Sequence, residues 1–381
     1  MTIRLYDQDS FLLSFEAKVC SCEKKGEYYA VTLDRTAFFP EGGGQGADHG
    51  TLGGVRVIDV HDVRGEVVHT TDGELAVGAC VPGEVDAQRR LEMMQQHSGE
   101  HIFSGIVNRL FGYDNVGFHI GSEAVTMDFN GPLTQEDIDR VERMANEVVW
   151  RDIPVRTLLP SKEELEQMTY RSKKALEGEV RIVCIEGADT CACCGTHVKH
   201  TGSIGQIKVL GWQKYKSGVR VSILCGSRAL AYENVLMEQV RRIGVALCVK
   251  QNETADAVSR LQSERDHLRW RCDMLGMQVF EQMAAAQAQE SVRVVACEAL
   301  PASMLRKAAG RLCEGAKMGL VLSPREDGWN FALSSQTEDV RPATRALCEA
   351  FGGKGGGPKD MTQGVLGACG EADICGMIRG L

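Results

Sequence analysis

Two short pairs of potential metal ligands constrain the fold of this chain more than any other feature. His97 and His101 stand four residues apart, and Cys193 and His197 repeat that spacing far downstream. On a helix, residues four apart project from one face, about one turn from each other. Nitrogen and sulfur ligands suit zinc better than calcium or magnesium. A fold that holds one zinc ion per chain with these residues must bring two distant segments together.

The composition is typical of a globular protein with two or three domains. The 381 residues are 43% hydrophobic and 25% charged. No run of about 18 apolar residues predicts a transmembrane helix, and the first residues do not resemble a signal peptide. Fifteen cysteines, an odd number, predict reduced thiols rather than a disulfide framework. We therefore expect a cytoplasmic protein that does not bind membranes.

Residues 1–85 predict a small, mostly antiparallel β-barrel. β-type runs at 28–33, 55–60 and 67–70 alternate with turn residues. One turn is the run Gly42-Gly43-Gly44-Gln45-Gly46. Consecutive glycines let backbone N–H groups approach a ligand closely, and the Gln45 amide can both donate and accept. No Gly-Lys-Ser/Thr follows, so a nucleotide-hydrolysing loop is not predicted.

Residues 86–228 predict an α+β domain. Asp86 can cap a helix that extends to about Leu110 and carries both His97 and His101. The apolar stripe expected on this helix consists of Leu91, Met94, Ile102 and Ile106. Segments 116–129 and 134–150 read as a hairpin and a second helix. Strand-like segments between 181 and 225 flank the loop with Cys193 and His197, which gives the chain an α+β fold class.

Residues 229–289 predict helices without any proline. Five apolar residues fall on one seven-residue grid that is interrupted at Thr254: Val240, Leu247, Leu261, Leu268 and Leu275. This pattern is typical of a coiled coil or helical hairpin and could form a homodimer. Residues 290–381 begin with a strand at 291–296, contain the glycine cluster 352–357, and form the fourth predicted domain.

The charge is unevenly distributed along an acidic chain. The formal net charge is −9, yet residues 190–232 contain no Asp or Glu. The basic residues of that stretch are Lys199, Lys208, Lys214, Lys216, Arg220 and Arg228. A basic segment beside a zinc site favours a locally held anionic substrate such as a nucleic acid. The alternative is a solvated face whose charges are balanced by acids elsewhere.

The helical histidine pair also fits a rival motif. His97-Ser98-Gly99-Glu100-His101 matches the H-x-x-E-H pattern of inverted zinc peptidases, in which the glutamate is the general base. Cys193, His197 and the glycine loop have no place in such a peptidase. A closed shell of four protein ligands is typical of structural zinc, whereas catalysis needs an open or labile position. A purely structural zinc therefore remains an alternative.

Four ordered motifs together resemble one family. They are Thr36–Gln45, Gln96–His101, Gly117–Gly121 and the run from Cys193 to Gly202, which contains Cys-Cys-Gly-Thr-His-Val followed by Thr-Gly. They are similar to those of alanyl-tRNA editing proteins, which are related to the editing domain of alanyl-tRNA synthetase. Residues 345–365 resemble the C-terminal DHH-associated domain of that synthetase, and the helices before it match its coiled coil.

The resemblance implies hydrolysis of tRNA(Ala) that carries serine or glycine, without an aminoacylation domain. It implies zinc ligation by His97, His101, Cys193 and His197. We assign catalytic roles to Glu100, Gln45 and Thr196. The amino-acid pocket would contain Gly43, Gly44, His119 and Asp128. The residues expected to bind tRNA are Lys199, Lys214, Lys216, Arg220, Lys354 and Lys359.

Two positions depart from the family pattern. Cys194 follows the ligand Cys193, where the family usually has Gly, and Glu100 precedes His101, where Thr or Gln is usual. Glu100 could alter amino-acid preference or act as a base for the attacking water. A tRNA-binding protein with structural zinc and an inverted zinc peptidase remain the alternative functions.

Overall fold

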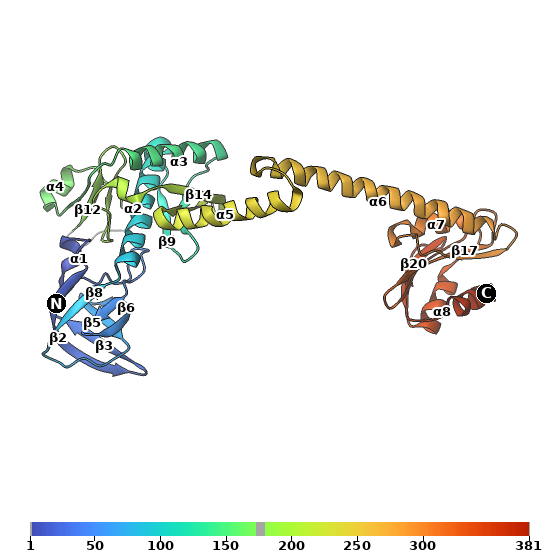
Figure 1. Cartoon of the computed structure of the whole chain (residues 1–381), viewed down its shortest axis with the longest axis horizontal. Coiled ribbons are helices and arrows are strands. Elements are labelled where there is room, and N and C mark those ends of the chain that lie inside the picture. The colour runs from blue at the N-terminus through green and yellow to red at the C-terminus, as the bar shows by residue number, and fades with distance from the viewer. Residues whose placement is uncertain (1, 173–179, 381) are drawn as a thin grey trace. The chain divides into compact units, whose positions relative to one another are not determined.

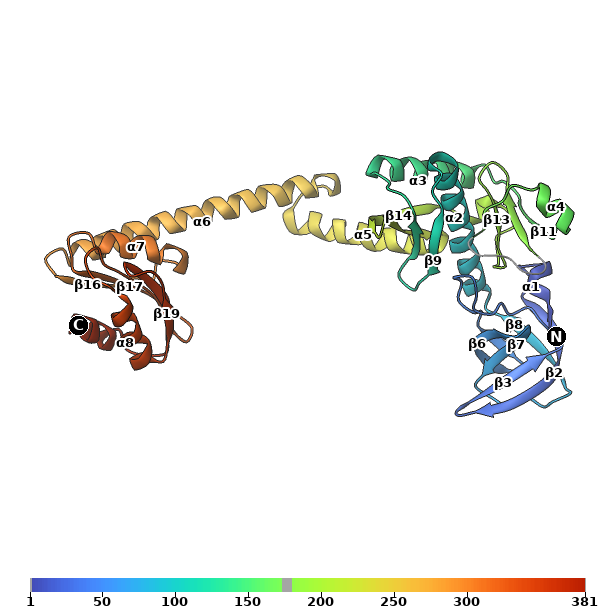
Figure 2. The same cartoon turned by 180° about the vertical axis from the view of Figure 1, so that it is seen from behind.

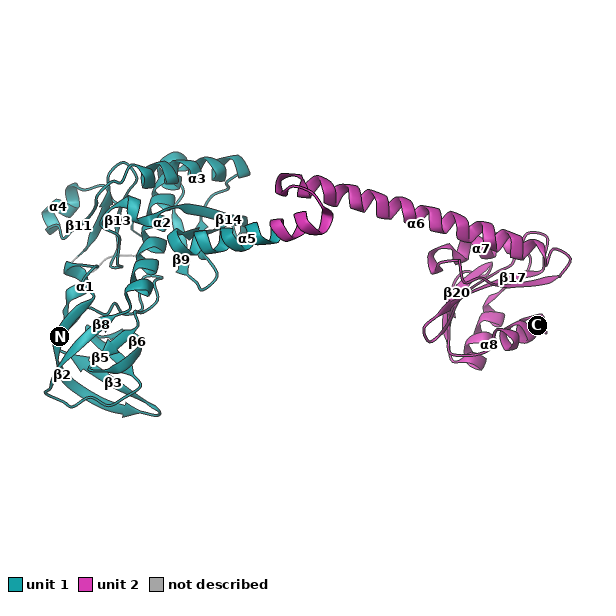
Figure 3. Cartoon of the chain, in the orientation of Figure 1, with its two compact units in different colours: residues 1–239 teal, residues 240–381 magenta. Residues whose placement is uncertain are grey.

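The computed structural model describes residues 2–172 and 180–380, which form two compact units (Figures 1 and 2). Unit 1 comprises residues 1–239 and unit 2 comprises residues 240–381 (Figure 3). Both units contain helices and β-sheet, so the predicted α+β class is confirmed. The finer division into four domains stays a prediction.

Six strands at the start of unit 1 close on themselves in the order β2-β3-β7-β6-β5-β8. Their inward side chains form one apolar core that includes Val31, Leu52 and Val60. The strands are β2 Ser14–Lys25, β3 Tyr28–Leu33, β5 Gly50–Leu52, β6 Val55–Val63, β7 Glu66–Thr71 and β8 Cys80–Val85. Two short strands, β1 Ile3–Arg4 and β4 Arg35–Thr36, pair in parallel beside helix α1, Leu5–Gln8.

His69 of β7 is fully buried inside this six-stranded barrel. Its Nδ1 lies 3.1 Å from the carbonyl oxygen of Val31, and its Nε2 lies 2.8 Å from the hydroxyl of Thr36. In the neutral ring Nδ1–H donates to Val31, and Nε2 accepts from Thr36. Burial lowers the pKa of His69 from 6.5 to about 4.

We expect the barrel to lose stability as the pH falls through this interval. The unfolded chain binds a proton below pH 6.5, whereas buried His69 binds it only near pH 4, so protons favour unfolding in between. The loss over the whole interval is roughly 3 kcal/mol. Denaturant unfolding of the wild type and of H69Q at several pH values measures it. In H69Q the free energy of unfolding should no longer show this part of the pH dependence. An equal dependence on pH in the wild type and H69Q would contradict the role assigned to His69.

Helix α2, Ala87–Phe111, is the structural centre of unit 1. Asp86 caps it by accepting a hydrogen bond from the backbone N–H of Arg89, and left-handed Gly112 ends it. Every residue from Met93 to Val107 is buried. Leu91 was predicted to belong to the buried stripe, but its side chain is 39% exposed. In the first turns of α2 the barrel instead covers the side of the helix that carries Arg90.

A four-stranded antiparallel sheet packs against α2 in the order β14-β15-β10-β9. Gly99 of α2 permits this approach, since a Cβ there would lie 2.3 Å from the Cys225 sulfur on β15. The strands are β9 Asn115–Ile120, β10 Val125–Phe129, β14 Ile207–Tyr215 and β15 Gly218–Cys225. Helix α3, Gln135–Trp150, begins at a capping box of Thr134 and Asp137 and also packs on α2. The predicted hairpin and second helix are thus confirmed.

The second short sheet of this region presents the downstream ligand loop. It has the order β11-β12-β13, with β11 Val155–Leu158, β12 Ile182–Ile185 and β13 Asp189–Ala192. Helix α4, Lys162–Gln167, and the 3₁₀ turn η1, Thr201–Ile204, flank it in sequence. Cys193 and His197 follow β13 directly, so the strand fixes where their loop meets α2.

A fully buried ion pair ties α2 to the segment between β4 and β5. The guanidinium of Arg90 donates from Nε to both carboxylate oxygens of Asp48, at 3.1 and 3.0 Å, and from Nη2 to Asp48 as well. It also donates to the carbonyl oxygens of Ser10 and Ala37, at 2.6 and 2.5 Å. Asp48 accepts the backbone N–H of Phe39 at 2.6 Å. The glycine loop lies between Phe39 and Asp48, so this pair anchors the loop to the histidine helix.

Unit 2 contains a five-stranded sheet in the order β16-β17-β18-β20-β19. Only β16 and β17 run parallel; the other neighbours are antiparallel. The strands are β16 Val292–Ala296, β17 Met318–Arg325, β18 Gly328–Ser334, β19 Lys354–Gly356 and β20 Met361–Leu366. Three helices lie among or after these strands in the chain, α7 Leu305–Leu312, α8 Arg341–Phe351 and α9 Glu371–Arg379, with the 3₁₀ turn η3 at Ala302–Met304.

Two separate helices occupy the region of the predicted seven-residue grid. α5, Gly226–Leu247, ends before the 3₁₀ turn η2, Gln251–Glu253, and α6, Thr254–Ala285, follows. Val240 and Leu247 therefore lie on a different helix from Leu261. The prediction of one continuous seven-residue repeat is wrong, and the repeat is confined to α6. Cys248, with φ of 54°, makes the break between the helices.

None of the fifteen cysteines forms a disulfide in the structure. Within residues 2–172 and 180–380, we find no helix whose length and apolar character would let it cross a membrane.

Candidate metal centre

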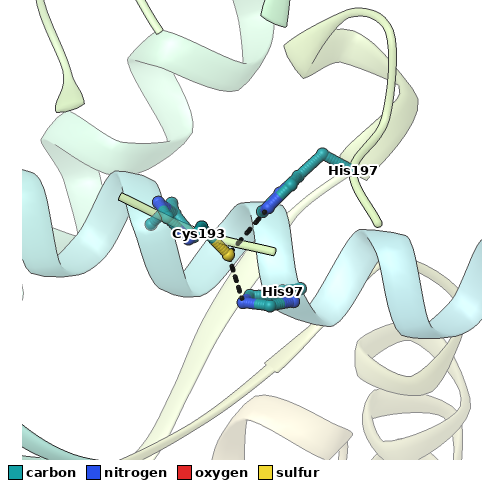
Figure 4. Close-up of side chains that lie close together, drawn as sticks. His97, Cys193 and His197 are labelled. Atoms are coloured by element: carbon teal, nitrogen blue, oxygen red, sulfur yellow. Dashed lines mark hydrogen bonds between the residues drawn. The ribbon is translucent and has the colours of Figure 1, made fainter. Parts of the chain in front are cut away.

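The structure brings the two distant ligand pairs together. One ligand atom from each of His97, His101, Cys193 and His197 lies within 4.8 Å of the others. The Cys193 sulfur is 3.4 Å from His97 Nε2 and 3.4 Å from His197 Nε2 (Figure 4). The three imidazole rings are 4.6 to 5.2 Å apart between centroids. Helix α2 supplies two ligands and the loop after β13 supplies the other two.

This donor set fits a zinc ion. With Zn–S of about 2.3 Å and Zn–N of about 2.0–2.1 Å, tetrahedral angles separate sulfur and nitrogen by about 3.6 Å. The observed separations of 3.4 Å match this geometry. His101 Nε2 is buried and has no hydrogen-bond partner among the described residues, as expected for a nitrogen that binds a cation.

A second set of side chains orients the three histidines through their Nδ1 atoms. His97 Nδ1 lies 2.8 Å from Gln45 Oε1, His101 Nδ1 lies 2.9 Å from Asp189 Oδ2, and His197 Nδ1 lies 3.2 Å from Ser98 Oγ. When each Nδ1–H donates to its partner, all three Nε2 lone pairs are free for a metal ion. Such partners fix the ring orientation and raise ligand basicity.

Cys193 is held as a thiolate, the form that binds a cation, whereas His101 must release a proton before its Nε2 can bind one. Burial alone would raise the pKa of the Cys193 thiol, but the surrounding His97, His101 and His197 outweigh it and lower this pKa well below 9.0. Burial lowers the pKa of His197 to about 3. Burial disfavours charged His101, yet Cys193 and Asp189 raise its pKa to about 9. A thiolate beside imidazole nitrogens is the form that binds zinc.

We expect Asp189→Asn to weaken zinc binding by roughly 10- to 100-fold. The Asp189 carboxylate is 2% exposed and accepts a bidentate pair from Arg171, at 2.7 and 2.8 Å, in addition to His101. Asparagine keeps the size but removes the charge that both partners need. Competition with a chromophoric chelator measures the affinity. Exposed Glu186 of the same turn offers the control E186Q, which should bind as the wild type does; D189N within a factor of about two of wild type would refute this role.

The glycine loop reaches the cluster through Gln45. Gly42 and Gln45 exchange two backbone hydrogen bonds of 3.0 Å across Gly43 and Gly44, whose φ values of 59° and 85° define a type I′ turn. Gln45 Nε2 donates to Thr196 Oγ1 at 2.8 Å, and the Thr196 backbone N–H lies 3.3 Å from Gln45 Oε1. Gln45 and Thr196 are each 1% exposed. Both predicted residues therefore lie beside the ligands.

Phe118 was not identified from the sequence, although it lies beside the cluster. Its ring centroid is 5.1 Å from that of His97, and a Cβ on Gly44 would lie 2.5 Å from its Cδ1. Gly195 is equally constrained, since a Cβ there would lie 2.2 Å from His97 Cε1. Asp189 and Ser98 were missed as well. Asp189 could have been suspected from its position four residues before Cys193.

Two predicted pocket residues, His119 and Asp128, lie on the face of the sheet that is opposite the one with Phe118. Phe118 pairs with buried Met127, whereas His119 pairs with Thr126 and Asp128 with Gly117. Side chains alternate between faces along a strand, so His119 and Asp128 lie opposite the face that carries Phe118. Asp128 is bonded to Arg220 on β15, at 2.6 and 2.7 Å.

Glu100 also has partners away from the ligand atoms. It is fully buried, and its Oε1 accepts hydrogen bonds from Ser104 Oγ and Asn115 Nδ2, both at 2.6 Å. Among the described residues it is not a member of the group of potential metal ligands formed by His97, His101, Cys193 and His197. A role as water-activating base would require these bonds to rearrange.

The basic segment is largely balanced by acids. Lys199 pairs with Asp9, Lys208 with Glu142, Arg220 with Asp128 and Arg228 with Glu92. Lys214 and Lys216 are exposed near the β14–β15 turn, and Lys354 and Lys359 are exposed in unit 2. These four lysines have no ion pair with a described residue and are the stronger candidates for contacts with an anion.

Two family models match the chain. Residues 8–89 match tRNA synthetases class II (A), and residues 180–222, which include Cys193 and His197, match the threonyl and alanyl tRNA synthetase second additional domain. The alanyl-tRNA editing protein AlaX-L of Pyrococcus horikoshii is 28% identical, over 97% of this chain and 95% of its own length. Editing protein Aarsd1 of Danio rerio is 31% identical, over 67% of this chain and 66% of its own.

An alanine–tRNA ligase of Ignicoccus hospitalis is 28% identical over 93% of this chain, but the chain spans only 40% of that ligase. Among solved structures, the C-Ala domain of Aquifex aeolicus alanyl-tRNA synthetase is similar to 23% of this chain and to 87% of that domain, with 21% identity and a TM-score of 0.22. The end-to-end match with AlaX-L and the family-model match to the segment around Cys193 and His197 agree with the motif resemblance. The chain belongs to the family of alanyl-tRNA editing proteins, which are relatives of alanine–tRNA ligase.

Proposed function

We propose that this protein hydrolyses the ester bond of tRNA(Ala) charged with the wrong amino acid, serine above all and glycine as a second substrate. The single observation that carries the proposal is the cluster of His97, His101, Cys193 and His197 within 4.8 Å. Similarity to proteins named for alanyl-tRNA editing supports the substrate class. The proposal concerns deacylation alone.

A zinc ion bound here, with one of the four ligands labile or its shell expanded when substrate arrives, would polarise the ester carbonyl and lower the pKa of a water toward ~7. The protein's own part is to place the ester against the ligands and to exclude bulk water. Gln45 holds His97 through the 2.8 Å contact, and Phe118 covers the same ring. Direct attack of water on the ester releases the amino acid, and the terminal tRNA hydroxyl leaves with the proton.

Thr196 is suited to recognise serine. Its hydroxyl oxygen accepts from Gln45 Nε2, which leaves the hydroxyl proton for a substrate acceptor. A site built to hydrogen-bond a hydroxyl rejects a substrate without one far more strongly than an apolar pocket rejects a small size difference. Alanine and glycine both lack this hydroxyl and would leave Thr196 without its partner, so tRNA(Ala) charged with either would be discharged far more slowly than Ser-tRNA(Ala).

Contacts with the tRNA are proposed for the exposed lysines. Lys214 and Lys216 lie on either side of Tyr215 near the β14–β15 turn of unit 1, and in unit 2 Lys354 lies within the glycine cluster and Lys359 shortly after it. Phosphate contacts of this kind position a nucleic acid and make binding depend on salt. We include cytoplasmic location and a homodimer in the proposal.

Purified protein tested against Ser-, Gly- and Ala-tRNA(Ala), with and without a chelator, tests the function. We expect rapid release of serine, far slower release of glycine and of alanine, and recovery of activity when zinc is returned. Full activity after verified metal removal would overturn the zinc mechanism. Equal release of all three amino acids would overturn the recognition of serine.

The same preparation separates the alternative functions. A tRNA-binding protein with structural zinc would bind the three tRNAs without discharging any of them. An inverted zinc peptidase would cleave peptides and would need Glu100 but not Cys193. The grouping of Cys193 and His197 with the helical pair, and the engagement of Glu100 by Ser104 and Asn115, favour the editing function.

A further inference from the structure

A β-bulge in strand β9 decides which of its side chains face helix α2. Phe118 pairs with Met127, and the register then shifts so that Asn115 pairs with Phe129, which leaves Val116 as the extra residue. Met127 and Phe129 are both buried on the face of the sheet that packs on α2. Directly paired residues lie on the same face of a sheet. Asn115 and Phe118 therefore both face α2 although they are three residues apart, and Val116 is 66% exposed.

Asn115 is joined to α2 by a closed set of three hydrogen bonds, which we call the Glu100 clamp. Asn115 Nδ2 donates to Glu100 Oε1 at 2.6 Å and to Ser104 Oγ at 3.0 Å, and Ser104 Oγ donates to the same carboxylate oxygen at 2.6 Å. None of the three residues is more than 3% exposed. Asn115 Oδ1 also accepts the backbone N–H of Gly117 at 3.2 Å across the bulge. Because hydrogen bonds to a buried carboxylate are strong and costly to lose, the clamp fixes the start of β9.

The other end of β9 is held by the glycine loop. The backbone N–H of Ile120 donates to the carbonyl oxygen of Gly44 at 2.8 Å. Phe118 lies between these two attachments: its ring centroid is 5.1 Å from that of His97, and its Cδ1 would lie 2.5 Å from a Cβ on Gly44. β9 is the last strand in the sheet order β14-β15-β10-β9, so among the described strands β10 alone pairs with it. The position of Phe118 beside the metal centre therefore depends on the clamp and on the loop.

We propose that Glu100 is a positioning residue: through Asn115 it fixes β9 so that Phe118 forms the wall of the amino-acid site beside His97. The proposal rests on the proposed deacylation, and it assigns Glu100 a task other than activation of the attacking water. Oε1 of this fully buried side chain receives both donors of the clamp. Its place one turn before Ser104 puts both side chains on one side of α2, where the helix meets the start of β9.

The two roles of Glu100 predict different kinetics. A wall contacts the amino acid in the ground state and in the transition state alike, so its displacement raises KM and leaves kcat nearly unchanged. A general base acts in the transition state, and its loss lowers kcat by roughly 100- to 10,000-fold. The KM and kcat of variants in the clamp therefore separate positioning from base catalysis.

Steady-state hydrolysis of Ser-tRNA(Ala) by N115A, E100Q and the double variant tests the role in the full chain. N115A removes a donor of the clamp and keeps the carboxylate, so KM should rise by roughly tenfold with kcat within about threefold of the wild type. E100Q keeps an acceptor oxygen, so KM should rise less and kcat should again stay within about threefold. The kinetics of E100Q/N115A should equal those of N115A, because both changes act through one set of bonds. V116A, at the exposed bulge position of the same strand, is the matched control and should behave as the wild type does.

Hydrogen exchange tests the clamp without the reaction. In N115A the β9 amides should exchange faster than in the wild type, whereas the zinc affinity, measured by competition with a chelator, should be unchanged. F118L should raise KM as N115A does, with β9 exchange as in the wild type, because it alters the wall and leaves the clamp intact.

Two results would overturn the proposal directly. Loss of kcat by more than about 100-fold in E100Q, with N115A like the wild type, would make Glu100 the base. Wild-type exchange of the β9 amides in N115A would show that the clamp does not hold the strand. A wild-type protein that discharges no Ser-tRNA(Ala) would overturn the proposed function and the wall with it, and the exchange result would still decide the clamp.

Discussion

The double variant C193A/H197A is expected to bind no zinc and to lose deacylation of Ser-tRNA(Ala) by more than roughly 100-fold. Both ligands of the downstream loop disappear, and the two histidines of α2 cannot hold zinc tightly alone. The Cys193 sulfur lies 3.4 Å from Nε2 of both His97 and His197, so its removal takes away a neighbour of two other ligands. Metal content by mass spectrometry and discharge of serine from tRNA(Ala) are the two measurements.

Cys194 provides the matched control for this variant. It is the next thiol in the chain, is exposed, and is not a member of the ligand group among the described residues. C194A should keep full zinc content and activity. Full activity in C193A/H197A, or loss of zinc in C194A, would contradict the assignment of the ligands.

Replacing Arg90 by alanine is expected to destabilise unit 1 by about 3–5 kcal/mol. Asp48 would remain as a buried charge without its partner, since both side chains of the pair are 0% exposed. The carbonyl oxygens of Ser10 and Ala37 would also lose their donor. Because the pair anchors the glycine loop, the variant should also bind zinc more weakly through loss of the Gln45 contact with His97.

Hydrogen exchange of amides in β2–β8 and α2 measures this loss of stability. Arg56, which pairs with Asp72 at 2.7 Å but is 75% exposed, offers the matched control within the same barrel. R56A should leave exchange close to that of the wild type, because exposed ion pairs contribute little. Equal protection in R90A and the wild type would contradict a structural role for the buried pair.

Local sequence patterns predicted the elements of the site well. The Asp86 cap and the apolar spacing predicted α2, and the segment 116–129 was correctly predicted as the hairpin of β9 and β10. Leu91 was placed wrongly because periodicity defines a face but not how far along the helix that face is covered. The seven-residue spacing of apolar residues from Val240 to Leu275 also failed to predict one helix. A turn at 248–253 preserves the spacing in sequence while it changes the direction of the chain.

The surroundings of the ligands were predicted less well. His119 and Asp128 were chosen from their chemistry, but strand register decides which face a side chain occupies, and it places Phe118 rather than His119 beside His97. Asp189 and Ser98 act through contacts with residues 88 and 99 positions away. No local pattern in a single sequence encodes such distances.

The sequence by itself determined which donors are available and which pairs of them share a helix or a loop, because spacing along a backbone of known geometry is a local property. Only the tertiary structure decided that the two pairs meet, since the packing of α2 against the loop after β13 depends on many long-range contacts formed at once. It also decided that each histidine has a partner at Nδ1 and an Nε2 that faces the Cys193 sulfur or is left without a hydrogen bond. The orientation of an imidazole ring is fixed by what lies on both of its sides, and in this protein those neighbours come from three different segments of the chain.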